Sequence, residues 1–224
     1  SATITDRLVA LSRALIGRIR GGLAQVNVLV SMFFAGMNGS VVADTATVGA
    51  LVLPAMKKAG YPAAFSAAVT GVSSTIGGII PPSIMMIVLA NSTEISIAAL
   101  FAAGIVPGVM IGIVIMIINH YFAIKYNFER SDEPFSIRRA GKELYRSSFA
   151  LLIPLVLVGS VMGGVASVVE AGAITAMVAL LTGVFVYRTI KWKECTGAFR
   201  RAFRNSAMVF IIIAASGPFS WLLT

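Results

Sequence analysis

One stretch of the sequence decides the fold: Ser73-Ser74-Thr75-Ile76-Gly77-Gly78-Ile79-Ile80-Pro81-Pro82-Ser83. It interrupts residues 59–93, which carry no charged side chain over 35 positions. As one helix these residues would extend about 52 Å, whereas the hydrocarbon core of a membrane is about 30 Å thick. Gly-Gly and Pro-Pro so close together cannot continue a helix. The sequence therefore predicts a discontinuous transmembrane helix over 59–93; the alternative is a packing helix kinked at Ser, Thr and Pro.

The composition is that of a membrane protein. Of 224 residues, 58% are hydrophobic and only 12% are charged, against roughly 45–50% and about 25% in soluble domains. Such hydrophobicity excludes disorder, and we predict an all-α, polytopic membrane protein. A single cysteine, Cys195, excludes an internal disulfide and a cysteine-rich metal site, and the lone His120 has no partner for zinc. Since the chain begins at Ser1, we expect a fragment.

The basic residues lie in four runs, at residues 7–20, 57–58, 125–146 and 188–204. A net charge of +9 first suggests nucleic-acid binding, but Lys and Arg near the ends of spans are typical of cytoplasmic loops. We therefore place all four runs in the cytoplasm and expect no nucleic-acid partner. The number of membrane crossings between consecutive runs must then be even.

Residues 21–56 contain one charge, Asp44, and a poor helix interior at Gly36-Met37-Asn38-Gly39-Ser40. Two half-length helices that enter and leave the membrane on the same side fit the length of residues 21–56 best. We predict a re-entrant helical hairpin with its tip near 36–45; two short full spans are the competing interpretation.

The rest of the chain divides by the same reasoning. Residues 1–20 predict an amphipathic arm helix at the membrane interface. We expect residues 21–93, with the hairpin at 21–56 and the broken helix at 59–93, to form half of a transport domain. Residues 95–187 predict further transmembrane helices with a cytoplasmic connector at 125–148. Residues 188–224 predict a second amphipathic connector and the start of a second, truncated repeat, as in many transporters.

The tip and the broken helix hold the candidate ligand groups. Unwound carbonyls and hydroxyls can coordinate sodium, and half-helix N-termini can hold an anion. Asp44 either caps the second helix of the hairpin or binds an ion. No nucleophile–base pair and no phosphate loop are present, so we expect neither an enzyme nor an ATP-driven pump. A passive anion channel and a non-transporting scaffold subunit are the alternatives to a carrier.

Several motifs resemble one transporter family. Phe34-Ala35-Gly36-Met37-Asn38-Gly39-Ser40-Val41-Val42-Ala43-Asp44 is similar to the first hairpin of the large membrane subunit (DctM-like) of TRAP transporters, the tripartite ATP-independent periplasmic carriers of the ion-transporter superfamily. The resemblance extends to Leu53-Pro54-Ala55-Met56, to the stretch 73–84 and to Gly104-Ile105-Val106-Pro107-Gly108.

The resemblance implies a function. Such subunits import organic acids, including C4-dicarboxylates and sialic acids, across the bacterial inner (cytoplasmic) membrane, coupled to sodium and by an elevator movement. They work with a small membrane subunit and a periplasmic substrate-binding protein. No cofactor other than the coupling ion Na+ is implied. The expected sodium ligands are Asn38, Gly39, Ser40, Asp44, Ser73, Ser74, Thr75 and Gly77. The expected substrate contacts are Asn38, Ser40, Thr45, Pro81, Pro82 and Ser83.

The chain also departs from the family's pattern. Gly78 stands where proline is expected, Asn38 where a small hydroxyl residue is usual, and Thr45 where alanine is usual. Residues 168–171 keep only the last two residues of a Thr-Glu-Ala pattern. The second hairpin and second unwound segment of the family are absent, so we expect half of a site and leave the substrate open.

Overall fold

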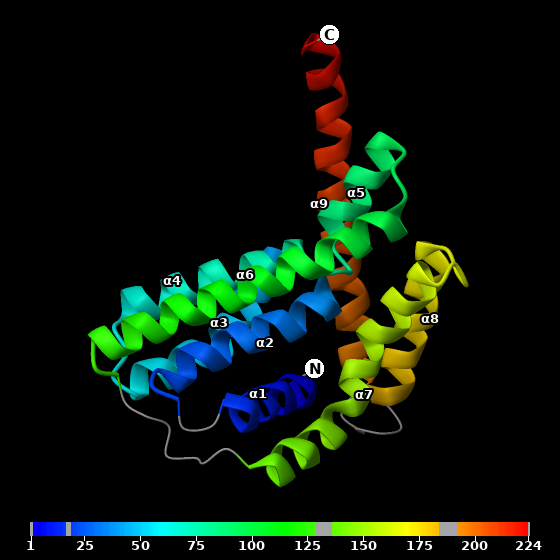
Figure 1. Cartoon of the computed structure of the whole chain (residues 1–224). Coiled ribbons are helices and arrows are strands. Elements are labelled where there is room, and N and C mark those ends of the chain that lie inside the picture. The colour runs from blue at the N-terminus through cyan, green and yellow to red at the C-terminus, as the bar shows by residue number, and fades with distance from the viewer. Residues whose placement is uncertain (1, 17–18, 129–135, 184–191, 224) are drawn as a thin grey trace. The chain divides into compact units, whose positions relative to one another are not determined.

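The computed structural model describes residues 2–16, 19–128, 136–183 and 192–223, which form helices and contain no strand (Figure 1). The chain divides into two compact units, Ser1–Ala179 and Leu180–Thr224. The helices are α1 (Ala2–Ile16), α2 (Gly22–Asn38), α3 (Val41–Lys58), α4 (Ala63–Ser74), the 3₁₀ turn η1 (Thr75–Gly78), α5 (Ile84–Thr93), α6 (Ile97–Lys125), α7 (Ile137–Met162), α8 (Val168–Leu181) and α9 (Trp192–Leu223). The prediction of an all-α fold is confirmed.

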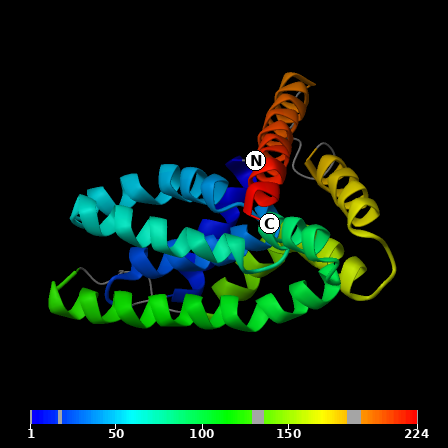
Figure 2. The same ribbon diagram turned by 90° about the horizontal axis from the view of Figure 1, so that it is seen from above.

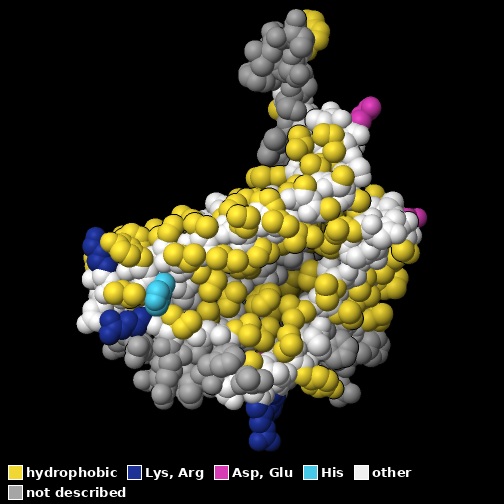
Figure 3. Space-filling view, in the orientation of Figure 1, with side chains coloured by type: hydrophobic (Ala, Val, Ile, Leu, Met, Phe, Trp, Pro, Cys, Tyr) yellow, Lys and Arg dark blue, Asp and Glu magenta, His cyan; other side chains and the backbone are white. Residues whose placement is uncertain are grey.

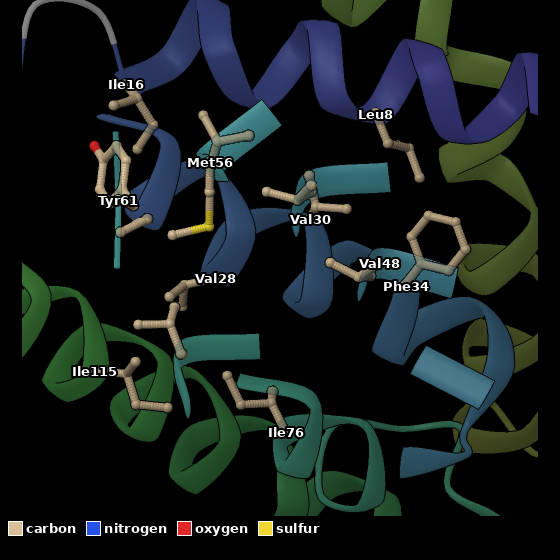
Figure 4. Packing of buried hydrophobic residues seen from close by; sticks show 14 of the residues in the cluster. Leu8, Ile16, Val28, Val30, Phe34, Val48, Met56, Tyr61, Ile76 and Ile115 are labelled. Carbon is tan, nitrogen blue, oxygen red and sulfur yellow. The ribbon is translucent and has the colours of Figure 1, made fainter. Parts of the chain in front are cut away.

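The centre of the first unit is a group of four long helices. α2 packs against α3, α4 and α6, and α3 also packs against α4. Figures 1 and 2 show α2, α3, α4 and α6 running side by side. Their apolar core includes Val28 and Val30 of α2, Val48 and Met56 of α3, and Ile76 of η1, all of them fully buried (Figure 4). The hairpin and the broken helix are therefore held in one continuous core.

One end of this bundle gathers the helix ends that carry basic residues. The space for a side chain at Gly21, before α2, is taken up by Ala123 near the end of α6. After the end of α3, the ring of Tyr61 lies 4.5 Å from that of Phe128, centroid to centroid. The chain therefore comes back to the same end of the bundle after the hairpin and again after α6. An even number of crossings between consecutive basic runs predicts this return. Figure 3 shows Lys and Arg side chains at the left end of the bundle and at the bottom of the view, and acidic side chains at the upper right.

The N-terminal helix packs on protein. α1 contacts α2 and α7, and Leu8 and Leu11 of its predicted apolar face are buried, while Leu15 of the same face is 42% exposed. Part of the apolar face thus covers the chain's own core. The placement of this helix at the membrane interface stays a prediction.

Several helix boundaries differ from those expected. α7 is one helix from Ile137 to Met162, so it joins half of the predicted connector 125–148 to the following apolar segment. α9 is likewise a single helix that runs through Gly217 and Pro218 to Leu223. Residues 129–135 and 184–191, which hold parts of both predicted connectors, lie outside the described residues.

Among the described helices, only Ile97–Lys125 is both long and apolar enough to cross a membrane by itself. Shorter apolar helices are Gly22–Asn38, Ile84–Thr93, Leu151–Met162 and Val168–Leu181. Short apolar helices are what a hairpin and a broken helix require, because each segment stops before a full span.

Candidate functional site: the junction of the hairpin tip and the broken helix

The hairpin turns at three residues. α2 ends at Asn38, Gly39 adopts the left-handed conformation with φ 60°, and its N–H donates to the carbonyl of Ala35. Ser40 then begins α3, its hydroxyl accepting a 3.4 Å hydrogen bond from the N–H of Ala43. Glycine at the end of one helix and serine at the start of the next are the residues these positions favour. The predicted tip at 36–45 is therefore a tight turn at its centre.

The second interruption comes later than the hydroxyl run suggested. Ser73 and Ser74 lie in the last turn of α4, and the chain stays helical through Gly78. Only residues 79–83 leave the helix. Ser83 spans this gap, because its hydroxyl donates a 2.7 Å hydrogen bond to the carbonyl of Gly78 and accepts the N–H of Met86 at 3.3 Å. The alternative of one kinked helix is wrong.

The two interruptions meet. The N–H of Ile84 donates a 3.1 Å hydrogen bond to the carbonyl of Gly39. A Cβ atom at Gly39 would overlap the carbonyl oxygen of Pro82, and one at Gly77 would lie 3.7 Å from the carbonyl carbon and oxygen of Ser40. The backbone of the tip thus lies directly on the backbone of the break, and at Gly39 only glycine permits this contact.

Glycines on α6 bring this helix against the same junction. A Cβ atom at Gly104 would meet the carbonyl oxygen of Ile79, and one at Gly108 would overlap the side chain of Ile80. The missing side chains of Gly104 and Gly108 therefore let α6 pack closely against the junction. The junction lies near the level of Gly104, about 10 Å along the helix axis from Ile97 and about 30 Å from Lys125.

Four helix ends converge here. α2 and η1 direct their C-terminal carbonyl groups at the junction, and α3 and α5 begin there with their N-terminal N–H groups. Carbonyl ends carry partial negative charge and N-terminal ends partial positive charge. One junction can therefore receive a cation and the carboxylate of an anion side by side.

A chain of buried polar side chains lies behind the junction, between α2 and α4. Asn27 donates to the hydroxyl of Thr70 at 2.7 Å, the hydroxyl of Ser73 lies 3.3 Å from the Asn27 Oδ1 atom, and the hydroxyls of Ser31 and Ser73 lie 3.2 Å apart. The ligands predicted from the sequence do not include Asn27, Ser31 or Thr70. Their signal is a spacing of four residues, which places Asn27 and Ser31 on one face of an apolar helix.

Asp44 lies at the end of this chain and does not cap α3. The capping hydroxyl belongs to Ser40, so the predicted capping role of Asp44 is wrong. The Asp44 side chain is 0% exposed. The hydroxyls of Ser74 and Ser31 are the polar side chains directed toward it, yet neither carboxylate oxygen has a partner within hydrogen-bond distance.

The structure separates the predicted ligands into groups. At the junction itself lie Asn38, Gly39, Ser40, Gly77, Pro81, Pro82 and Ser83; behind it lie the buried Asp44, Ser73 and Ser74. Thr45 and Thr75 are exposed, and each hydroxyl donates to its own helix, at Val41 and Val72. Asn38 is exposed as well. The roles of all these residues as ligands stay predictions.

A helical hairpin whose tip meets a broken helix inside an apolar bundle is typical of the substrate-binding half of a secondary transporter. The family described as "Tripartite ATP-independent periplasmic transporter, DctM component" matches residues 1–224, and the chain belongs to this family. It is thus related to a component of a bacterial membrane transporter, and the membrane character predicted from composition agrees with the family.

Individual relatives carry different substrate names. The chain is 34% identical over 221 residues to the C4-dicarboxylate TRAP transporter large permease protein DctM of Pseudomonas aeruginosa, covering 99% of this chain and 52% of the relative. It is 30% identical over 223 residues to the sialic acid TRAP transporter large permease protein SiaM of Vibrio cholerae, and the match covers 100% of this chain and 52% of that relative. It is 31% identical to the isethionate TRAP transporter permease protein DctMQ of Oleidesulfovibrio alaskensis, and the match covers 99% of this chain and 35% of that relative. The chain thus spans about half the length of the first two.

Proposed function

We propose that this chain forms the hairpin-bearing half of the large permease subunit of a sodium-coupled transporter that imports an organic acid. The observation that carries the proposal is the junction of four helix ends, held together by the hydrogen bond from Ile84 to Gly39. A fold that only had to anchor other subunits would not need two interrupted helices in backbone contact. Family membership and the names of the relatives support the same function.

Sodium fits the donor groups at the junction. It is a hard cation that prefers oxygen, and the tip offers the carbonyls at the end of α2 together with the hydroxyl of Ser40. The break adds the carbonyls of residues 79–82, which lie outside regular helix. These oxygens carry no formal charge, which suits a monovalent ion better than a divalent one.

The substrate carboxylate fits the N-terminal ends of α3 and α5. Side chains and backbone of Asn38, Ser40 and Thr45 would contact it from the tip, with Pro81 and Pro82 from the break. Ser83 is different, because its hydroxyl already bonds to Gly78 and Met86. Ser83 therefore positions the start of α5. The substrate is an organic acid of the C4-dicarboxylate or sialic acid class.

The remaining parts of the proposal are expectations that the family resemblance supports. The permease receives substrate from a periplasmic binding protein, pairs with a small membrane subunit, and moves its transport domain as an elevator in the bacterial inner membrane. The relative named permease protein DctMQ, of which the match covers only 35%, is a much longer chain. The basic end of the bundle faces the cytoplasm, and exposed apolar residues on α6, such as Ile113 and Ile117, face lipid or other parts of the complete permease.

Uptake by proteoliposomes tests this function. The complete permease with its partner subunits is reconstituted, and labelled organic acid is offered against its own gradient with an imposed inward sodium gradient. We expect uptake that stops without sodium, and that Ser40→Ala or Asp44→Ala abolishes while membrane insertion persists. Ser92→Ala, which removes an exposed hydroxyl of α5, is the matched control. Movement of the acid only down its gradient would indicate a passive anion channel, and no movement a scaffold subunit.

A further inference from the structure

The basic end of the bundle carries a cluster of five aromatic side chains that come from two separate parts of the chain. Tyr61 and Phe65 lie at the turn into α4, and Phe122, Tyr126 and Phe128 lie at and after the end of α6. The ring centroid of Phe128 is 4.5 Å from that of Tyr61 and 5.1 Å from that of Phe65. The ring of Phe122 is 6.0 Å from Phe65 and 5.9 Å from Tyr126. The cluster therefore fixes the end of α6 beside the turn between α3 and α4.

Three exposed lysines lie at the helix ends that this cluster joins. Lys57 and Lys58 end α3, and Lys125 ends α6. The Nζ atom of Lys125 lies 5.7 Å from the ring centroid of Tyr126, which is a cation–π contact. Residues 45–93 and 95–128 contain these three lysines and neither an arginine nor an acidic residue. The charged side chains that α3 to α6 bring to this end are therefore all positive.

An exposed ridge of α6 leads from apolar residues to this positive end. Ile113, Ile117, Tyr121 and Lys125 follow one another four residues apart, along one ridge of the helix, and span about 18 Å of its axis. The side chain of Ile113 is 50% exposed, that of Ile117 63% and that of Tyr121 62%. Figure 3 shows apolar side chains along this face and Lys and Arg side chains at its left end. A tyrosine between apolar and charged positions is typical of the boundary between hydrocarbon and water.

We propose that this ridge, together with Lys57 and Lys58, binds one anionic phospholipid at the basic end of the bundle. The ammonium groups of the three lysines hold the phosphate, and one acyl chain lies along Ile113 and Ile117. The order of apolar, aromatic and cationic side chains on α6 matches the order of acyl chain, interface and headgroup in a lipid. A zwitterionic lipid carries its own cation beside the phosphate, which the lysines repel, so the site favours a headgroup with net negative charge.

The lipid site is separate from the junction of the hairpin and the broken helix. Gly104 marks the level of the junction on α6, about 30 Å along the helix axis from Lys125. A lipid bound at the basic end would hold the end of α6 against the turn that follows α3 and would contact none of the expected ion or substrate ligands. The inference therefore goes beyond the proposed function and does not depend on sodium coupling.

Lipid binding to the purified complete permease in detergent tests the inference. The permease is titrated with dioleoylphosphatidylglycerol or with dioleoylphosphatidylcholine, which share their acyl chains, and with inorganic phosphate. Native mass spectrometry gives the apparent Kd of the bound lipid, and thermal unfolding gives the stabilisation. The variants are Lys125→Gln, the double variant Lys57→Gln with Lys58→Gln, and the triple variant. Lys142→Gln, at an exposed position of α7, is the matched control from another basic run.

We expect the wild type to bind phosphatidylglycerol more tightly than phosphatidylcholine. Lys125→Gln should weaken the binding of phosphatidylglycerol about fivefold and the double variant about 25-fold, since each lysine near an anionic headgroup contributes a factor of about five. The triple variant should no longer distinguish the two lipids. Lys142→Gln should bind as the wild type does, and inorganic phosphate should not raise the melting temperature. All three lysines are exposed, so their replacement by glutamine should leave the fold intact.

Four results would overturn the inference and leave the proposed function standing. Equal affinity of the triple variant and the wild type for phosphatidylglycerol would mean that the lysines or the ridge are covered by another part of the permease. An equal loss with Lys142→Gln would mean only a general attraction between charges. Stabilisation by inorganic phosphate alone would indicate an anion site without a lipid. A melting temperature that the lysine variants lower equally in both lipids would mean that the lysines act on the carbonyl ends of their helices.

Discussion

The carbonyl oxygen of Gly39 accepts a hydrogen bond from the N–H of Ile84, at 3.1 Å. This bond joins the turn of the hairpin to the first residue of α5, so the end of one interrupted element is fastened to the restart of the other. Both groups are left without a partner inside their own helices. The junction therefore pairs two backbone groups that their own helices leave unpaired, and breaking it would cost both elements at once.

Gly39→Ala is expected to open this contact. Gly39 has φ 60°, and an added Cβ would overlap the carbonyl oxygen of Pro82, which is backbone and cannot rotate away. The strained conformation and the overlap together should lower the free energy of unfolding by about 2–4 kcal/mol, and uptake should be lost. Thermal unfolding and uptake of the complete permease measure the two effects.

The matched control is Gly71→Ala on α4, where an added Cβ meets nothing within 4 Å. Alanine there should be neutral or stabilise the helix by up to about 1 kcal/mol. Equal stability of the Gly39 and Gly71 variants would show that the tip does not rest on the break.

The positions of both breaks could be predicted from the sequence, because glycine, proline and serine act on the backbone locally. Gly39 with Ser40 marked the hairpin turn, and the Pro81-Pro82 pair marked the break. The sequence predicts unwound backbone at the hydroxyls 73–75, yet these residues lie in helical backbone, and Thr75 bonds to the carbonyl of Val72 in the preceding turn.

The polar chain could not be predicted in the same way. Asn27 and Thr70 are far apart in the sequence, and their contact depends on how α2 and α4 are rotated against each other. The spacing of polar residues indicates a polar face, but not which neighbouring helix covers it. For the same reason the capping role predicted for Asp44 was wrong, since a carboxylate one turn inside a helix faces whatever packs there.

Ser83→Ala is expected to loosen the start of α5. Its hydroxyl spans the break, donating to Gly78 and accepting from Met86. Loss of a cap and of one buried hydrogen bond should destabilise the permease by about 1–3 kcal/mol. Ser92→Ala, near the end of the same helix, removes an exposed hydroxyl that bonds to Val88, and thermal unfolding should not distinguish it from the wild type. Similar melting temperatures for the two variants would show that the Ser83 hydroxyl does not hold the start of α5.

Asn27→Ala is expected to be more disruptive than its size suggests. The side chain is fully buried and links the hydroxyls of Thr70 and Ser73. Its removal takes one buried hydrogen-bond partner from each of them and leaves a cavity, at a cost of about 2–4 kcal/mol. Asn91→Ala, at an exposed position of α5, should change stability by less than about 0.5 kcal/mol. If the free energies of unfolding of the two variants differ by less than about 0.5 kcal/mol, the polar chain does not hold α2 against α4.

Labelling of single cysteines tests the direction in which the bundle crosses the membrane. The chain has one cysteine, Cys195, so Cys195→Ser provides the background for Lys58→Cys and Glu94→Cys. Both positions are exposed, at the end of α3 and between α5 and α6. If the basic end faces the cytoplasm, an impermeant maleimide should label Glu94→Cys in cells with a permeabilised outer membrane. Lys58→Cys should react only after the inner membrane is opened, and its labelling while that membrane is intact would reverse the orientation proposed for every helix of the first unit.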